Sequence, residues 1–106
     1  MVKVFKVGLI GCGHIAETYF RAHKYFNNFR IIKCADINHL AAKKCASTYK
    51  IKALSVKNLL KDKEIEIILN LTVPKAHFEV SKKALLNNKH VLCEKFVYPF
   101  WNTIKK

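Results

Sequence analysis

The chain has 106 residues, of which 51% are hydrophobic and 25% are charged, and this composition excludes disordered and fibrous classes of protein. Such a length suffices for one domain with one core, and it is too short for a cofactor domain together with a full substrate domain. Twenty Lys and Arg residues against seven Asp and Glu residues give a formal net charge of +13, which attracts phosphates and acidic surfaces.

The four cysteines are widely separated in the sequence, at Cys12, Cys34, Cys45 and Cys93. They form no C-x-x-C pair and are accompanied by no paired histidine spacing, so the sequence predicts no metal site, no redox motif and no disulfide. Cys34 and Cys93 lie in apolar runs and are expected to be small core residues in a reducing cytosol. Neither a signal-peptide core nor an apolar stretch long enough to span a bilayer is present, and we expect a cytoplasmic protein.

Apolar periodicity predicts strands that alternate with helices along the whole chain. The β-branched apolar runs are typical of strands buried on both faces of a sheet, and the three-to-four spacing between them is typical of helices with one apolar stripe. Asn38 and Ser55 are expected to cap helices, and Pro74 to begin one. The expected strands are 2–10, 30–36, 51–54, 65–73 and 90–93, and the expected helices are 13–26, 40–49, 55–60 and 74–86.

The sequence VGLIGCGHIA at residues 7–16 reads as a buried strand, a glycine turn and the start of a helix, a combination that can hold the phosphates of a dinucleotide. Gly11 would permit the tight turn, Gly13 would let the backbone approach a pyrophosphate, and Ala16 would take the close-packing third position. Backbone N–H groups at the positive end of the helix would meet the phosphates. The candidate phosphate-binding residues are Gly11, Cys12, Gly13, His14 and Ile15.

Polar residues stand where the other predicted strands end. Asp36 is the last residue of the second expected strand, where a carboxylate can bind ribose hydroxyls; alternatively, it is only an acidic residue before the Asn38 cap. Thr72 lies at the end of the fourth, and Glu94 and Lys95 follow the fifth. The alternation of elements predicts an α/β fold, a doubly wound parallel sheet of about five strands, in which all these strand ends meet at one edge.

Three blocks of sequence resemble the glucose–fructose oxidoreductase / inositol dehydrogenase / MocA family of NAD(P)-dependent oxidoreductases. They are GLIGCGHIA at residues 8–16, LTVPKAH at 71–77 and KHVLCEKF at 89–96. The middle block is similar to that family's threonine-proline turn, and the last is similar to its strand ending in Glu-Lys-Pro. The resemblance covers residues 2–95 and implies a Rossmann-like cofactor domain.

That resemblance also implies roles for individual residues. Lys95 would lie near the nicotinamide and the hydroxyl of a sugar or cyclitol substrate, where an ammonium can polarise the carbonyl that forms. Glu94 would orient that lysine, and His77 would be a cofactor-side or packing residue. Without the resemblance, Glu94 and Lys95 read as an exposed pair after a strand. Asp36 favours NAD over NADP, because a carboxylate repels a 2′-phosphate.

The last eleven residues depart from the family pattern. Phe96 stands where the family has proline, and residues 96–106 show no helical pattern, whereas family members continue into a substrate domain. We therefore expect a cofactor domain at 1–95 and a divergent tail at 96–106, in a truncated product that binds the cofactor without turnover, because hydride transfer needs a positioned substrate.

Two other classes of function stay open. One is a non-catalytic nucleotide-binding or interaction module, which could pair with a second copy through an open sheet edge to form a homo-oligomer. The other is nucleic-acid binding through net charge. Only Arg21 and Arg30 are arginines, and specific base reading favours arginine, so solvated helix faces explain the scattered lysines better.

Overall fold

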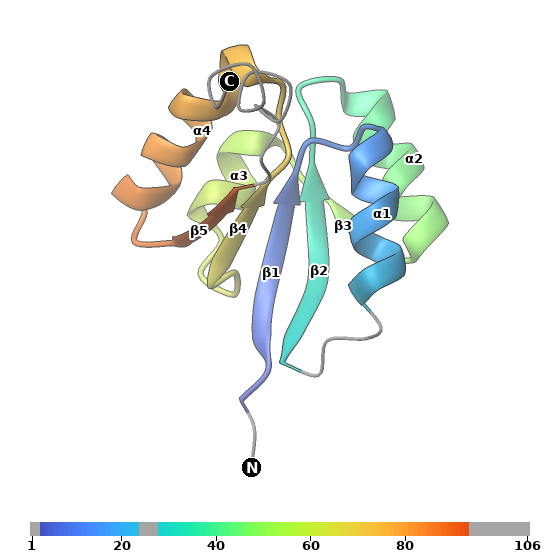
Figure 1. Ribbon diagram of the computed structural model, residues 1–106, viewed down its shortest axis with the longest axis horizontal. Coiled ribbons are helices and arrows are strands. Elements are labelled where there is room, and N and C mark those ends of the chain that lie inside the picture. The colour runs from blue at the N-terminus through green and yellow to red at the C-terminus, as the bar shows by residue number, and fades with distance from the viewer. Residues whose placement is uncertain (1–2, 24–27, 94–106) are drawn as a thin grey trace, which may run out of the picture.

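The computed structural model describes residues 3–23 and 28–93 (Figure 1). Strands and helices alternate in the predicted order, and no helix in these ranges is long and apolar enough to cross a membrane. The elements are β1 (Phe5–Ile10), α1 (His14–His23), β2 (Phe29–Ala35), α2 (His39–Tyr49), β3 (Lys52–Ala53), α3 (Val56–Lys61), β4 (Ile67–Asn70), α4 (Pro74–Leu86) and β5 (His90–Cys93).

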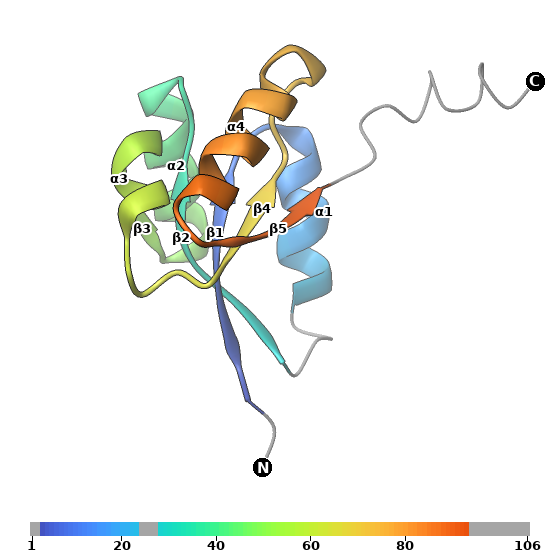
Figure 2. The same ribbon diagram turned by 90° about the vertical axis from the view of Figure 1, so that its left-hand side faces the viewer.

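The strands form one parallel sheet in the order β3-β2-β1-β4-β5, which confirms the predicted doubly wound, Rossmann-like fold. From β1 the chain moves outward through β2 to β3, and then returns to the other side of β1 to add β4 and β5. Figure 2 shows β5 and α4 from that second edge. The reversal lies between β1 and β4, and the crevice at such a switch point is where open α/β sheets bind ligands.

Two hydrophobic layers pack on the two faces of the sheet. On one face, Leu9 and Cys34 pack with residues of α1 and α2. On the other, Ile10 and Ile68 pack with residues of α3 and α4, including Leu59. Because successive strand residues point to opposite faces, apolar runs without alternation are what a doubly covered sheet requires. Burial on both faces therefore explains the continuous apolar strands.

The predicted helix starts are confirmed. The side chain of Asn38 accepts hydrogen bonds from the N–H groups of Leu40 and Ala41, and the hydroxyl of Ser55 accepts one from the N–H of Asn58. Both residues thereby satisfy N–H groups that a helix leaves unpaired in its first turn. Pro74 begins α4, where its missing N–H costs nothing.

Several predicted bounds were wrong. The expected strand 65–73 is confined to Ile67–Asn70, because the chain leaves the ladder once the N–H of Leu71 has bonded to the carbonyl of Ile10 at 2.8 Å. The strand expected from residue 2 begins at Phe5. Within α4, Ala84 is fully buried, whereas Leu85 is 62% exposed. Residues 24–27, where the first helix was expected to end, lie outside the described part of the chain.

Candidate nucleotide-binding site

Gly11 is the residue at which β1 turns away from the sheet. Its φ is +106°, and a Cβ atom at this position would lie 2.5 Å from the carbonyl oxygen of Leu71. Its N–H donates a 2.9 Å hydrogen bond to the carbonyl of Ala35 at the end of β2. Only glycine satisfies both the left-handed backbone and the close contact with the neighbouring chain. The turn predicted from the sequence is thus built by contact with the strand ends on both sides.

Gly13 differs from Gly11 in its surroundings. A Cβ atom here would meet no heavy atom within 4 Å, and the residue lines an open cavity. His14 then begins α1, so the positive end of the helix dipole lies directly after this glycine. Bare backbone facing open space at a helix N-terminus suits the close approach of a pyrophosphate. The half-buried side chain of Ile15 packs against the core, so this residue could contribute to the turn only through its backbone.

Asp36, directly after β2, is held by two backbone donors. The N–H of Cys12 donates to its Oδ2 at 2.7 Å, and the N–H of Asn38 donates to its Oδ1 at 2.8 Å. The carboxylate is therefore fixed in orientation beside the glycine turn, and Asp36 lines the same cavity as Gly13. One expectation needs correction: the N–H of Cys12 is not free for a phosphate, because it positions Asp36.

A buried asparagine organises the end of β4. Asn70 is fully buried, and its Nδ2 donates to the carbonyl of His77 and to the hydroxyl of Ser81, each at 2.9 Å. Its Oδ1 accepts from the N–H and the hydroxyl of Thr72, at 3.1 and 2.6 Å. The side chain thus ties the loop after β4 to α4. Sequence reasoning missed this role, although an amide at the end of an apolar strand was the available signal.

These strand ends surround a cavity of about 780 Å³, a size typical of small-molecule sites. Gly11, Gly13, Asp36 and Thr72 line it, as expected for the site. It also includes Ile37, whose side chain is 92% exposed, and three lysines from α3 and α4 that were not predicted as site residues, Lys57, Lys61 and Lys83. The cavity therefore combines an apolar wall, one oriented carboxylate and basic groups.

Three other residues were predicted for the site, namely His77, Glu94 and Lys95. His77 is half-buried in α4 and is not among the residues that line the cavity. Its backbone carbonyl accepts a hydrogen bond from Asn70. Glu94 and Lys95 lie outside the described residues. The strand that precedes them ends at Cys93, which is paired in register with Asn70 of β4.

The residues at this edge of the sheet fit a dinucleotide. The glycine turn supplies bare backbone at a helix start, and the fixed carboxylate at the end of β2 supplies acceptors for ribose hydroxyls. Both belong to one cavity. The arrangement is that of a nucleotide site at the topological switch point of a parallel sheet.

Comparison with known proteins agrees with this geometry. The chain is 29% identical over 94 residues to inositol 2-dehydrogenase of Salmonella typhimurium, an alignment that spans 85% of this chain and 28% of that protein. The structure of myo-inositol dehydrogenase from Lactobacillus casei, in complex with NAD(H) and myo-inositol, superposes with a TM-score of 0.77 at 27% identity, over 87% of this chain and 28% of that one.

A 3-ketoreductase from Actinomadura kijaniata, KijD10, in complex with NADP and TDP-benzene, shares the fold with a TM-score of 0.80 at 24% identity, over 88% of this chain and 29% of that one. The chain thus spans under a third of the length of these relatives. The sequence profile of one family, described as an oxidoreductase family with an NAD-binding Rossmann fold, matches residues 5–105 and so reaches into the segment 96–106. This chain belongs to the glucose–fructose oxidoreductase / inositol dehydrogenase / MocA family and comprises its NAD-binding domain.

Proposed function

We propose that this chain binds NAD(H) in preference to NADP(H), as the cofactor portion of an oxidoreductase acting on a sugar or cyclitol. The observation that carries the cofactor preference is the fixed carboxylate of Asp36, held at both oxygens by backbone N–H groups beside the glycine turn. A carboxylate in that position accepts from ribose hydroxyls and repels a 2′-phosphate. The three cavity lysines lie on α3 and α4.

Four residues of the cavity have roles in nucleotide binding in this proposal. Gly11 lets the chain turn, Gly13 lets the pyrophosphate approach the backbone, and Asp36 orients the adenosine ribose. Thr72, held by Asn70 at the end of β4, forms the wall beside the glycine turn. The bound nicotinamide would accept or donate the hydride.

Lys95 is our candidate for the group that hydrogen-bonds the reacting hydroxyl, with Glu94 orienting it. This assignment rests on the similarity of residues 89–96 to the family strand that ends in Glu-Lys-Pro. The names of the relatives support the substrate class, since they include an inositol 2-dehydrogenase. We expect these 106 residues alone to bind the cofactor without turnover, because hydride transfer requires a substrate held about 3–3.5 Å from the reacting carbon.

Titration of the full chain with NADH, followed by the change in nicotinamide fluorescence, tests the proposal. We expect saturable binding of NADH and at least ~10-fold weaker binding of NADPH, the factor that corresponds to ~1.4 kcal/mol. Tighter binding of NADPH would refute the cofactor preference. Absence of binding by either nucleotide would refute the function itself.

A further inference from the structure

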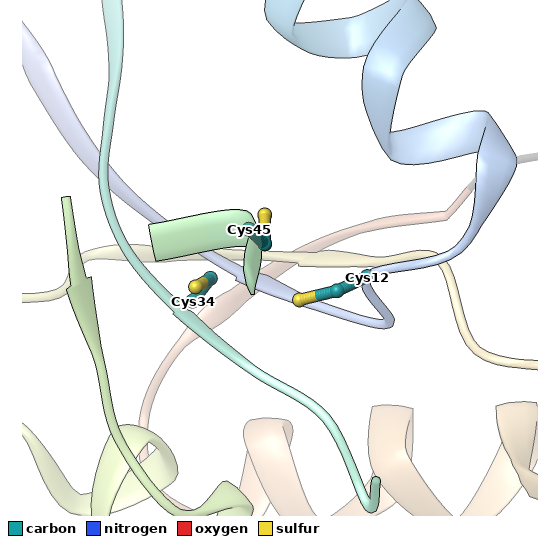
Figure 3. Close-up of side chains that lie close together, drawn as sticks. All are labelled: Cys12, Cys34 and Cys45. Carbon is teal, nitrogen blue, oxygen red and sulfur yellow. The ribbon is translucent and has the colours of Figure 1, made fainter. Parts of the chain in front are cut away.

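Three cysteines from separate parts of the chain meet beneath the glycine turn. The sulfur atoms of Cys12, Cys34 and Cys45 all lie within 4.8 Å of one another. Figure 3 shows the side chain of Cys12 extending from the loop after β1 toward those of Cys34 on β2 and Cys45 on α2. The spacing of the cysteines in the sequence did not indicate this cluster, because none of them lies within a few residues of another.

The fold explains why these sulfur atoms come together. Strands β1 and β2 are neighbours, with Leu9 paired to Cys34, so the loop that begins after β1 passes over the end of β2. Helix α2 packs on the same face, where the thiol of Cys34 donates a 3.5 Å hydrogen bond to the carbonyl of Ala42, one turn before Cys45. The thiol of Cys12 donates to the carbonyl of Ala35 at 3.5 Å. The three cysteines therefore belong to three different parts of the fold, the loop after β1, strand β2 and helix α2.

We propose that Cys12, Cys34 and Cys45 form a three-thiolate site that binds a soft monovalent metal ion, copper(I). Three points that are at most 4.8 Å apart always have a common position within about 2.8 Å of each, and a metal–thiolate bond is about 2.3 Å long. Each sulfur atom therefore needs to move by only about half an ångström to reach the ion. A change of that size is within the reach of a small rotation about χ1.

The set of ligands selects the kind of ion. Thiolates are soft ligands, which favour copper(I), zinc or iron–sulfur clusters. Structural zinc takes four ligands in a tetrahedron, whereas the cluster found among the side chains that the structure describes holds three. Copper(I) is satisfied by three thiolates in a plane. The number and softness of the ligands therefore point to copper(I).

Binding at this site is an exchange of protons for the metal ion. Each coordinating thiol releases its proton to solvent, the Cu–S bonds form, and copper stays in the +1 state, so no oxidant or reductant is consumed. The bound site carries two net negative charges, and the positive end of α1, two residues after Cys12, offsets part of them. Cys34 and Cys45 are buried and Cys12 is half-buried, so the ion would enter past Cys12 and would then be shielded from water.

Anaerobic titration of the full chain with copper(I), in competition with the chromogenic chelator bicinchoninate, tests the proposal. We expect one copper(I) per chain and an X-ray absorption spectrum with three sulfur neighbours at about 2.3 Å. Failure of the protein to withdraw copper(I) from the chelator, or a spectrum dominated by nitrogen and oxygen neighbours, would overturn the proposal. The spectrum of the unmodified protein decides this even where a variant does not fold.

Two alanine variants locate the site. Cys45→Ala removes one proposed ligand from a helix that tolerates alanine, and Cys93→Ala is the matched control, because β5 lies at the opposite edge of the sheet from β2 and β3. Loss of a group that only hydrogen-bonds to a metal ligand typically lowers metal affinity by ~10–100-fold. Because Cys45→Ala removes a ligand itself, we expect its copper(I) affinity to fall by more than this. Cys93→Ala should retain the affinity of the unmodified chain. Equal affinity in both variants, or a loss confined to Cys93→Ala, contradicts the assignment.

Discussion

The backbone N–H of Cys12 donates a 2.7 Å hydrogen bond to Oδ2 of Asp36. The donor follows β1 and the acceptor follows β2, so this bond joins the glycine turn to the carboxylate that we assign to the ribose. Asp36 therefore has two functions: it shapes the loop that would hold the phosphates, and it presents acceptors to the nucleotide. Substitutions at this residue can separate the two.

Asp36→Ala should weaken NADH binding by about 10–100-fold, because it removes both the acceptor for the ribose and the anchor of the Cys12 N–H, each a hydrogen bond to a charged group. Asp36→Asn retains an oxygen for the Cys12 N–H and loses the charge, so its NADH affinity should fall less and its relative affinity for NADPH should rise. Fluorescence titration with both nucleotides measures this. Glu66→Gln, at the opposite end of the sheet, is the control, and an unchanged NADH affinity in Asp36→Ala would sink the ribose assignment.

Gly11→Ala should mainly lower stability, whereas Gly13→Ala should mainly weaken NADH binding. At Gly11 the φ of +106° and the 2.5 Å approach to the Leu71 carbonyl oxygen leave no room for a methyl group, so we expect a loss of ~2 kcal/mol or more in the free energy of unfolding. At Gly13 the added methyl group meets open space, so stability should change by less than ~1 kcal/mol while NADH binding weakens. Urea denaturation and NADH titration of both variants measure these effects. A Gly11→Ala variant as stable as the unmodified protein would contradict this expectation, because the turn would then be able to move away from Leu71.

Asn70→Leu should destabilise the protein by about 2 kcal/mol, because the substitution removes the acceptor that Asn70 now offers to both the N–H and the hydroxyl of Thr72 at the end of β4. Thr72→Val removes only one of these hydrogen bonds and should cost about 1 kcal/mol. The free energy of unfolding in urea is the measurement for both. If the two substitutions cost the same, Asn70 does not organise this loop.

The ion pair between Lys33 and Asp62 should make stability depend on pH in the acid range. Their side chains are 16% and 17% exposed, with Nζ and Oδ2 2.5 Å apart, and hydrogen bonding to Lys33 lowers the pKa of Asp62. A carboxyl group with a lowered pKa in the folded state contributes stability that is fully present above its unfolded pKa of about 4, and the contribution is lost as pH falls through the folded value.

Hydrogen bonding to Asp62 also raises the pKa of Lys33, so the contribution of Lys33 is fully present below its unfolded pKa of about 10.4 and is lost as pH rises above it. Lys33→Met should therefore flatten the loss of stability between about pH 4 and pH 2. Urea denaturation at a series of pH values compares this variant with the unmodified protein, and Lys63→Met serves as a control on an exposed lysine. Parallel pH profiles for Lys33→Met and the unmodified protein would rule out the pair as the source of the acid dependence.

Much of the fold could be predicted because its signals are local. Apolar runs of β-branched residues, the caps at Asn38 and Ser55, and Pro74 at a helix start each depend on neighbours in the chain, and the structure confirms them. The ends of elements were less predictable. The apolar run 65–73 continues past the last ladder pair, since Leu71 is buried in the loop as completely as a strand residue would be.

Part of the candidate site could likewise be predicted from the sequence, and part could not. The glycine turn, Asp36 and Thr72 could be found from the sequence, because each stands at the end of a recognisable strand and parallel strands bring such ends to one edge. The bond between Cys12 and Asp36, the role of Asn70 as a double donor and acceptor, and the lysines contributed by α3 and α4 could not, because they depend on how helices and loops pack over the sheet.

The sequence by itself determined the order of elements, the parallel sheet and the place where a dinucleotide would meet it, because periodicity and turn chemistry are read within a few residues. Only the tertiary structure decided that Cys12, Cys34 and Cys45 share one small space. Metal-binding cysteines that are closely spaced along a chain can be recognised in the sequence. Here, however, a loop, a strand and a helix each contribute one sulfur atom. Their meeting depends on the pairing of β1 with β2 and on the packing of α2 across them.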